Sequence, residues 1–290
     1  FIQEEVVRAI HDGHITDVYP ALTQQTNIPW ENMAYARRII NALYRTGDKA
    51  SAEALAGYAV DESVPETIRL EALKNLMEWE QPPALDRVNG MWRPLEPRAL
   101  DFSEDLKISL MNNALSSDTV ELQLAAMTFV QTYKVNSADH TLYALLSDKQ
   151  FKKDVRIAAL KALSSLNTKL FEKAIHTAME AKSSTIRLAG IEQLAKLDPV
   201  AAVPLLDNAI NSGSMSEKQT AFKALGSIAG ADAEAVLLNR VNSLVEGKAD
   251  KEIQVDIIEA AEVSPSKNVK EAIDAYHASF TDPESIAKYL

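Results

Sequence analysis

The stretch VRIAALKALSSL, residues 155–166, returns in altered form as IRLAGIEQLAKL, residues 186–197. In both copies apolar residues recur every three or four positions, as they do along one face of an α-helix. Three further stretches share this frame: IRLEALKNLMEW from Ile68, LQLAAMTFVQTY from Leu122 and EKQTAFKALGSI from Glu217. The chain therefore contains an internal helical repeat.

The second position of this frame recurs at nearly regular intervals. It is occupied by Ala36, Arg69, Gln123, Arg156, Arg187, Lys218 and Gln254, which are 33, 54, 33, 31, 31 and 36 residues apart. Most intervals hold a second helical pattern after the first, for example over residues 168–181. One helix pair cannot bury its apolar side alone, whereas stacked pairs form a continuous core. We therefore expect an all-α fold, an α-solenoid that spans residues 1–290 as a single domain of about seven units.

The period and the phrase V-R-x-x-A-x-x-A-L from Val155 resemble HEAT repeats. Tetratricopeptide repeats have a similar length, but their W-x-x-L-G-x-x-Y signature is absent from the chain. The resemblance implies HEAT-like helical units.

The stretch PPALDRVNGMWRPLEPR, residues 82–98, interrupts the array and accounts for the long interval of 54 residues. Its prolines exclude a helix, because proline lacks the backbone donor and constrains the residue before it. Asn89-Gly90 supplies a turn. Since the segment is poor in glycine and serine, we expect a restrained loop and not a flexible linker.

Two interpretations of this loop compete. In the structural one, Trp92 folds back with Met91 and Leu95 to plug an apolar groove, while the arginines pair with acidic neighbours. In the functional one, the tryptophan and the arginines face outward as a binding anchor, since both types are common at interface hot spots. We favour the structural interpretation because large aromatic side chains are mostly buried, and we expect Trp92→Ala mainly to lower the melting temperature. Under either interpretation the candidate site residues are Asp86, Arg87, Trp92, Arg93 and Arg98.

Residues 65–98 also resemble the HEAT-repeat portion of exported bacterial proteins of the glucose/sorbosone-dehydrogenase type. The matching phrase is Asp86-Arg87-Val88, then Gly90, then Trp92-Arg93-Pro94-Leu95. In that family a dehydrogenase-like propeller precedes the repeats and a c-type cytochrome domain commonly follows. The resemblance implies a scaffold that links these two domains in a periplasmic or otherwise exported redox protein. No catalytic residue of the family has a counterpart here, so we expect the chain itself not to be an enzyme.

Other features of the sequence agree with a scaffold. The chain lacks cysteine and the common phosphate-binding, zinc-protease and serine-hydrolase motifs. His11 and His14 form its single close histidine pair, which we interpret as a polar helix end because no further ligand lies nearby in the sequence. We therefore expect no cofactor and no metal, and partners that are proteins or neighbouring domains of the same polypeptide. No apolar run approaches the ~20 residues of a membrane span, and the start FIQEEVVRAI suggests a processed form or a segment of a longer chain.

Two alternatives remain open. The first is a free-standing cytoplasmic HEAT-repeat adaptor that binds another protein. The second is a helical-repeat nucleic-acid-binding enzyme of the DNA-glycosylase kind, for which residues 149–173 supply a basic stretch. The net charge of −11 over the whole chain opposes nucleic-acid binding, and Phe151 is the only aromatic residue near the start of that stretch.

Overall fold

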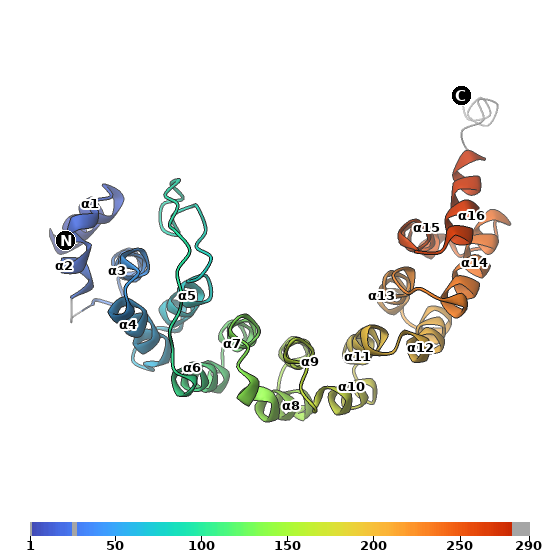
Figure 1. The fold of residues 1–290 in the computed structure, drawn as a ribbon, viewed down its shortest axis with the longest axis horizontal. Helices are drawn as coiled ribbons and strands as arrows, with labels where there is room; N and C mark the ends of the chain where they lie inside the picture. The colour runs from blue at the N-terminus through green and yellow to red at the C-terminus, as the bar shows by residue number, and fades with distance from the viewer. Residues whose placement is uncertain (1, 25–27, 280–290) are drawn as a thin grey trace. The chain divides into compact units, whose positions relative to one another are not determined.

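The structure is a computed structural model that describes residues 2–24 and 28–279. Over these residues the fold is all-α, with no named β-strand (Figure 1). Its α-helices are α1 (Ile2–Asp12), α2 (Tyr19–Thr23), α3 (Met33–Thr46), α4 (Lys49–Val60), α5 (Glu66–Met77), α6 (Glu104–Ser116), α7 (Val120–Tyr133), α8 (Asp139–Ser147), α9 (Lys153–Leu166), α10 (Phe171–Met179), α11 (Ser184–Leu197), α12 (Pro199–Ser212), α13 (Met215–Gly226), α14 (Ala231–Val245), α15 (Gln254–Val263) and α16 (Lys267–Ala278). Short 3-10 helices lie at Thr16–Val18, Asn136–Ala138 and Lys251–Ile253.

The predicted repeat is confirmed by the placement of its frame. Every frame residue falls in an odd-numbered helix from α3 to α15, and even-numbered helices alternate with them along the chain. The fold is the expected α-solenoid of HEAT-like helical repeats, with one inserted loop between α5 and α6.

The second position of the frame has a structural role that the sequence pattern did not reveal. In five of the repeats its side chain donates to a backbone carbonyl at the end of the preceding α-helix or in the turn that follows it. The bonds are Arg69 to Ala59 (3.3 Å), Gln123 to Ser117 (2.8 Å), Arg156 to Leu146 (2.8 Å), Arg187 to Ala181 and Lys182 (3.0 and 2.9 Å) and Gln254 to Ala249 (3.1 Å). The last carbonyls of a helix have no partner within the helix, and cations favour that end of its dipole. These side chains therefore join each repeat to the helix before it.

The chain divides into two compact units, which we describe separately. The first comprises residues 1–145 with 165–168, and the second comprises residues 146–164 with 169–290. The prediction of a single domain stays a prediction.

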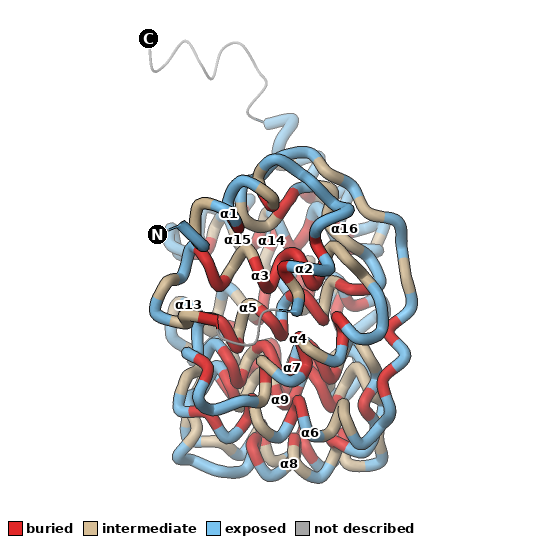
Figure 2. The backbone as a smooth tube through the Cα atoms, turned by 90° about the vertical axis from the view of Figure 1, so that its left-hand side faces the viewer, coloured by how far each residue is buried: buried red, intermediate tan, exposed pale blue. Residues whose placement is uncertain are grey.

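The core of the first unit lies between its stacked helices, where buried positions recur along each helix (Figure 2). Ile39 and Leu43 of α3 are buried with Leu55 of α4 and Leu73 of α5. Trp79, which follows α5, is 1% exposed and meets the ring of Tyr44 edge to face at 5.9 Å. This aromatic pair closes the end of the core at the point where the inserted loop leaves α5.

The second unit has its own apolar core. Phe222, Leu237, Ile257 and Ile273 are buried there, one each from α13, α14, α15 and α16. The first turn of α13 is closed by a capping box in which Ser214 and Glu217 each accept a backbone hydrogen bond from the other.

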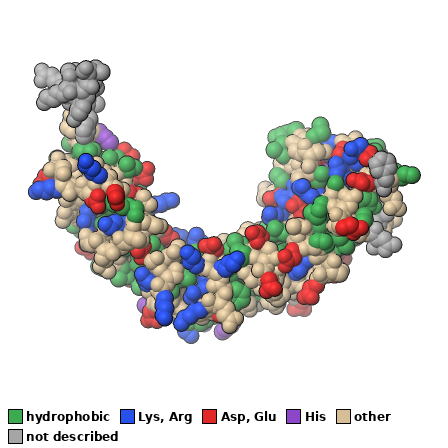
Figure 3. Space-filling view, turned by 180° about the vertical axis from the view of Figure 1, so that it is seen from behind, with side chains coloured by type: hydrophobic (Ala, Val, Ile, Leu, Met, Phe, Trp, Pro, Cys, Tyr) green, Lys and Arg blue, Asp and Glu red, His purple; other side chains and the backbone are tan. Residues whose placement is uncertain are grey.

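Lys and Arg side chains and Asp and Glu side chains both occur over the face drawn in Figure 3, in blue and red. The three tryptophans, Trp30, Trp79 and Trp92, all belong to the first unit. Among the described helices, none combines the length and the apolar character needed to cross a bilayer.

Candidate functional site

The inserted loop forms a short two-stranded ribbon that leaves α5 and lies beside α3 (Figure 1). The N–H of Asp86 donates to the carbonyl of Met91, and the N–H of Arg93 donates to the carbonyl of Ala84, both at 2.8 Å. Leu85 and Trp92 stand opposite each other between these two bonds. The predicted restrained loop is therefore a hairpin-like ribbon.

Asp86 builds the turn of the ribbon. Its Oδ1 atom accepts from the N–H of Val88 at 2.9 Å and from the N–H of Asn89 at 3.1 Å. Its carbonyl accepts from the N–H of Gly90 at 2.9 Å. Gly90 has a φ of +71°, in the left-handed region that favours glycine. The Asn89-Gly90 turn expected from the sequence is thus formed around the aspartate that precedes it.

The ribbon sorts its side chains onto two faces. Successive side chains of an extended strand point to opposite sides, so Leu85 and Trp92 share one face while Asp86 and Arg93 share the other. Leu85 and Trp92 form the non-hydrogen-bonded type of pair, in which opposite side chains come closest. Both are open to solvent, with 53% and 73% of their surface exposed.

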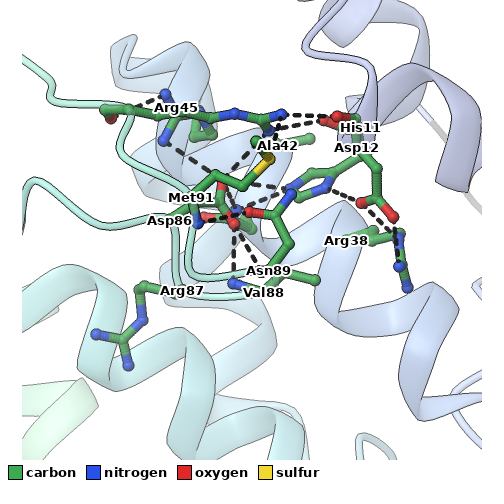
Figure 4. A network of polar contacts seen from close by, with 12 residues as sticks. His11, Asp12, Arg38, Ala42, Arg45, Asp86, Arg87, Val88, Asn89 and Met91 are labelled. Atoms are coloured by element: carbon green, nitrogen blue, oxygen red, sulfur yellow. Dashed lines mark hydrogen bonds and ion pairs between the residues drawn. The ribbon is translucent and has the colours of Figure 1, made fainter.

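The inner face of the ribbon meets a buried polar network, drawn in Figure 4. The carboxylate of Asp86 is completely buried, and its Oδ2 atom accepts from Nδ2 of Asn41 at 2.9 Å. The guanidinium groups of Arg45 and Arg93 lie 3.5 and 3.8 Å from the same oxygen. Burial by itself raises the pKa of Asp86, but the two backbone donors of the turn, His11 and Asn41 together hold it below its usual range. Asp86 is therefore a charged group that ties the ribbon to α3.

His11 of α1 completes the network and is fully buried. The atom of Asn41 that faces Asp86 must be the donor Nδ2, since the carboxylate only accepts. That same Nδ2 lies 2.7 Å from Nε2 of His11, so Nε2 accepts and the ring proton sits on Nδ1, which donates to Asp12 at 2.8 Å. Burial lowers the pKa of His11, against the opposing effect of Asp12 and Asp86. The imidazole is neutral, in one defined tautomer.

The C-terminal end of α1 is held from two sides. Arg93 donates to the carbonyls of His11 at 3.1 Å and Asp12 at 2.6 Å, in the position where a cation favours a helix dipole. Arg38 of α3 makes a two-pronged ion pair with the carboxylate of Asp12, at 3.1 and 2.7 Å. The hydrogen bond from Arg38 lowers the pKa of Asp12 to about 2. We call the set His11, Asp12, Arg38, Asn41, Arg45, Asp86 and Arg93 the clasp, because it joins α1, α3 and the ribbon.

The other two predicted arginines also face inward. Arg87 pairs with Glu71 in the middle of α5 at 3.1 Å and with Glu78, the residue that follows α5. Burial opposes the charge of Arg87, but these two carboxylates raise its pKa. Arg98 lies over the rings of Trp79 and Tyr44, 3.8 and 4.6 Å from their centres, where burial lowers its pKa. The loop is therefore held at Asp86, Arg87, Arg93 and Arg98.

The arginines of the loop face inward, as the structural interpretation expects, whereas Trp92 faces outward, as the functional interpretation expects. The expected pairing with acidic neighbours is present for Arg87 and Arg93, whereas Arg98 lies over aromatic rings instead. The expectation that Trp92 plugs a groove is wrong, since it belongs to the outer face of the ribbon together with Leu85. Met91 is 54% exposed, but it stands opposite Asp86, and its Sδ atom accepts from Arg93 at 3.6 Å on the inner face. The outer face, which we define as Leu85 and Trp92, is an apolar surface on a fixed support.

The histidine pair does not form a shared site. His11 is sealed inside the clasp, whereas His14 is exposed and lies 3.4 Å from the hydroxyl of Tyr19. Within residues 2–24 and 28–279, no group of three or more His, Cys, Asp or Glu residues could hold a metal ion.

Sequence reasoning missed His11, Asn41 and Arg45 as partners of the loop. Asn41 carried one available signal, because it is a polar residue in the middle of the apolar frame YARRIINALYRT. A polar residue at a core position needs a buried partner, and Asp86 is that partner, 45 residues away in the chain.

Comparison with known proteins finds similar solved structures, of which we describe two. One is the complex of CpcE and CpcF of phycocyanin lyase from Nostoc sp. PCC7120, at 15% identity and a TM-score of 0.43, covering 90% of this chain and 94% of that chain. The other is human deoxyhypusine hydroxylase in complex with glycerol, at 15% identity and a TM-score of 0.34, covering 90% of this chain and 96% of that chain. No family model matches the chain, and no curated protein matches its sequence. At these scores neither structure assigns a substrate, an activity or a partner to this chain.

The comparisons correct two expectations. The resemblance to glucose/sorbosone-dehydrogenase-type proteins is wrong, because the similar structures are a phycocyanin lyase and a deoxyhypusine hydroxylase. The phrase that suggested it is the ribbon, whose residues are accounted for by local packing, and the expectation of export loses its support with it. The expectation that the chain is not an enzyme is wrong as well: both similar structures carry the names of enzymes, so a helical-repeat fold without familiar motifs does not place a chain outside the enzymes.

Proposed function

We propose that this helical-repeat chain binds a protein partner and that the outer face of the ribbon is the point of contact. The observation that carries the proposal is Trp92, which is 73% exposed on a loop whose inner face is fixed by the clasp. A mobile loop would lose conformational entropy on binding, whereas a fixed loop presents its side chains already ordered.

The composition of the outer face supports a protein partner. Tryptophan is among the residues most enriched at interface hot spots, and truncating one costs about 2 kcal/mol or more of binding free energy. Leu85 stands opposite Trp92 on the same face and enlarges the apolar contact. The complementary surface is an apolar pocket large enough to receive an indole ring.

Site-specific photo-crosslinking tests the proposal. Trp92 is replaced by p-benzoylphenylalanine in the full chain, which is expressed in cells of the organism that makes it. The matched control carries the same crosslinker at Val255, an apolar residue of the second unit that is 63% exposed. We expect a discrete crosslinked species from position 92 that is absent from position 255 and is lost when Leu85→Asp is added.

Two results would contradict the proposal. One is the same pattern of products from positions 92 and 255, which would indicate only general exposure. The other is the absence of any product from position 92 in cells where the chain is abundant.

A further inference from the structure

A groove runs along the seam between α13 and α15 in the second unit. It has a volume of about 330 Å³ and is lined by Gln219, Phe222, Lys223, Asp256, Glu259, Ala260, Glu262 and Val263. The two helices approach closely because Gly226 has no side chain: a Cβ atom there would lie 2.8 Å from the carbonyl oxygen of Ala260. The seam is therefore a fixed feature of the packing of this unit.

The floor of the groove is apolar. Phe222 and Ala260 are buried beneath it, and Val263 at its edge is 63% exposed. Asp256, Glu259, Ala260 and Val263 follow each other at i, i+3, i+4 and i+7, so they form one stripe along α15. At 1.5 Å per residue the stripe is about 10 Å long, which matches roughly two turns of a bound helix.

The walls of the groove have unequal charge. The α15 side carries the carboxylates of Asp256, Glu259 and Glu262, whereas the α13 side carries the single cation of Lys223. In the described part of the chain, Glu262 has one ion-pair contact, with His277 at 3.2 Å, and neither Asp256 nor Glu259 has any. Several carboxylates grouped beside an apolar surface attract cations more strongly than the same groups do in open solvent.

We propose that this groove binds a basic, amphipathic peptide segment of a partner protein. An apolar side chain of the segment would lie on Phe222, Ala260 and Val263, and its Lys or Arg residues would face Asp256, Glu259 and Glu262. Charge complementarity selects this occupant, since an acidic segment would be repelled from the α15 side. The site belongs to the second unit and does not depend on the ribbon.

Binding is measured with the full chain and three fluorescein-labelled 14-residue probe peptides, by fluorescence anisotropy. The first places Leu at helical spacing among Lys residues, the second replaces Lys by Glu, and the third replaces Leu by Ser. We expect saturable binding of the Lys/Leu peptide alone, weakened by raised salt because the charges are exposed. Hydrogen exchange should then show new protection in α13 and α15 when that peptide is added.

Variants at exposed positions locate the site without disturbing the core. The double variant Glu259→Lys with Glu262→Lys should weaken binding at least about tenfold, and Val263→Ser should weaken it about fivefold through lost apolar contact. The matched control is Glu271→Lys with Asp274→Lys, which makes the same change of charge on exposed positions of α16. Circular dichroism checks that each variant is folded.

Three outcomes overturn the proposal: no binding of the Lys/Leu peptide, equal binding of the Lys/Ser peptide, or an equal effect of the groove and control variants. The last two would indicate general attraction of cations to an acidic protein. The crosslinking at Trp92 is a separate measurement, so either proposal can fail while the other stands.

Discussion

The Nε2 atom of His11 lies 2.7 Å from the Nδ2 atom of Asn41, and this contact requires a neutral imidazole. A second proton on the ring would bring two donors face to face, in a site that also holds Arg38, Arg45 and Arg93. Asp12 and Asp86 oppose that effect. The balance of these groups makes the first unit sensitive to acid.

Stability of the first unit should fall as the pH falls below 6.5. The pKa of His11 is lower in the folded chain than its ordinary value of 6.5, so the unfolded chain binds the proton first. The stabilisation is complete above pH 6.5 and is lost as the pH falls toward the folded pKa, by at most about 1.4 kcal/mol per pH unit for one group. Urea unfolding followed by tryptophan fluorescence, between pH 8 and pH 5, measures this because all three tryptophans lie in the first unit.

His11→Gln should flatten that pH dependence, since its amide can still accept from Asn41 but does not titrate. His14→Gln is the control, because it removes a nearby histidine that is exposed and lies outside the clasp. Partial burial lowers the pKa of His14 as well. An unchanged slope in His11→Gln would mean that another group senses the proton.

Asp86→Asn should destabilise the first unit by about 3–5 kcal/mol. The substitution removes the negative partner of Arg45 and Arg93 and leaves their charges buried without compensation. Hydrogen exchange should then speed up in α1, which Arg93 holds through two carbonyls. Asp101→Asn, at an exposed position outside the ribbon, should change neither quantity measurably, and a similar loss in both variants would argue against the clasp.

Trp92→Ala should leave the melting temperature nearly unchanged, within about 0.5 kcal/mol of unfolding free energy, because the side chain is exposed. Trp79→Ala is the informative comparison, since that ring is buried and its removal should cost about 3–5 kcal/mol. Thermal unfolding monitored by circular dichroism separates the two cases. A large loss in Trp92→Ala would restore the structural interpretation of this residue.

Arg69→Ala should destabilise the first unit by about 2 kcal/mol. It removes the bond to the carbonyl of Ala59 and leaves Asn113, which accepts from Arg69 at 2.6 Å, without this donor. Arg69→Gln should recover part of the loss, because Gln123 and Gln254 make the equivalent carbonyl bond in their own repeats. Equal losses in both variants would show that the positive charge and not the hydrogen bond matters.

The sequence was sufficient to predict the helical repeats but not the direction in which the side chains of the ribbon point. The reason is physical. Helical periodicity is a local property, so the frame at Arg156 and Arg187 predicted the helices and the position of the insertion. The direction of Trp92 depends on which residue it faces across the ribbon. That register is set by the bonds from Asp86 to Met91 and from Arg93 to Ala84, and a shift by one residue would have turned Trp92 inward.

The clasp could not be predicted from spacing, because its members are far apart in the chain. His11 and Asp86 carry no mutual pattern, and each has an ordinary local explanation as a helix end or a turn residue. The groove between α13 and α15 was also missed, since its floor follows from the contact of Gly226 with Ala260 in three dimensions.

The contact between Arg93 and α1 has a consequence during synthesis. The guanidinium that holds the end of α1 belongs to a residue 82 positions after His11. At about 5–20 residues per second, a ribosome takes about 4–16 seconds to add that many residues. During that time α1 lacks its later partner. The side chains of α1 that the clasp will cover are then exposed together with Ile2 and Val6, which stay exposed in the folded chain. Chaperones that recognise apolar segments therefore have seconds in which to bind α1 before Arg93 holds its end.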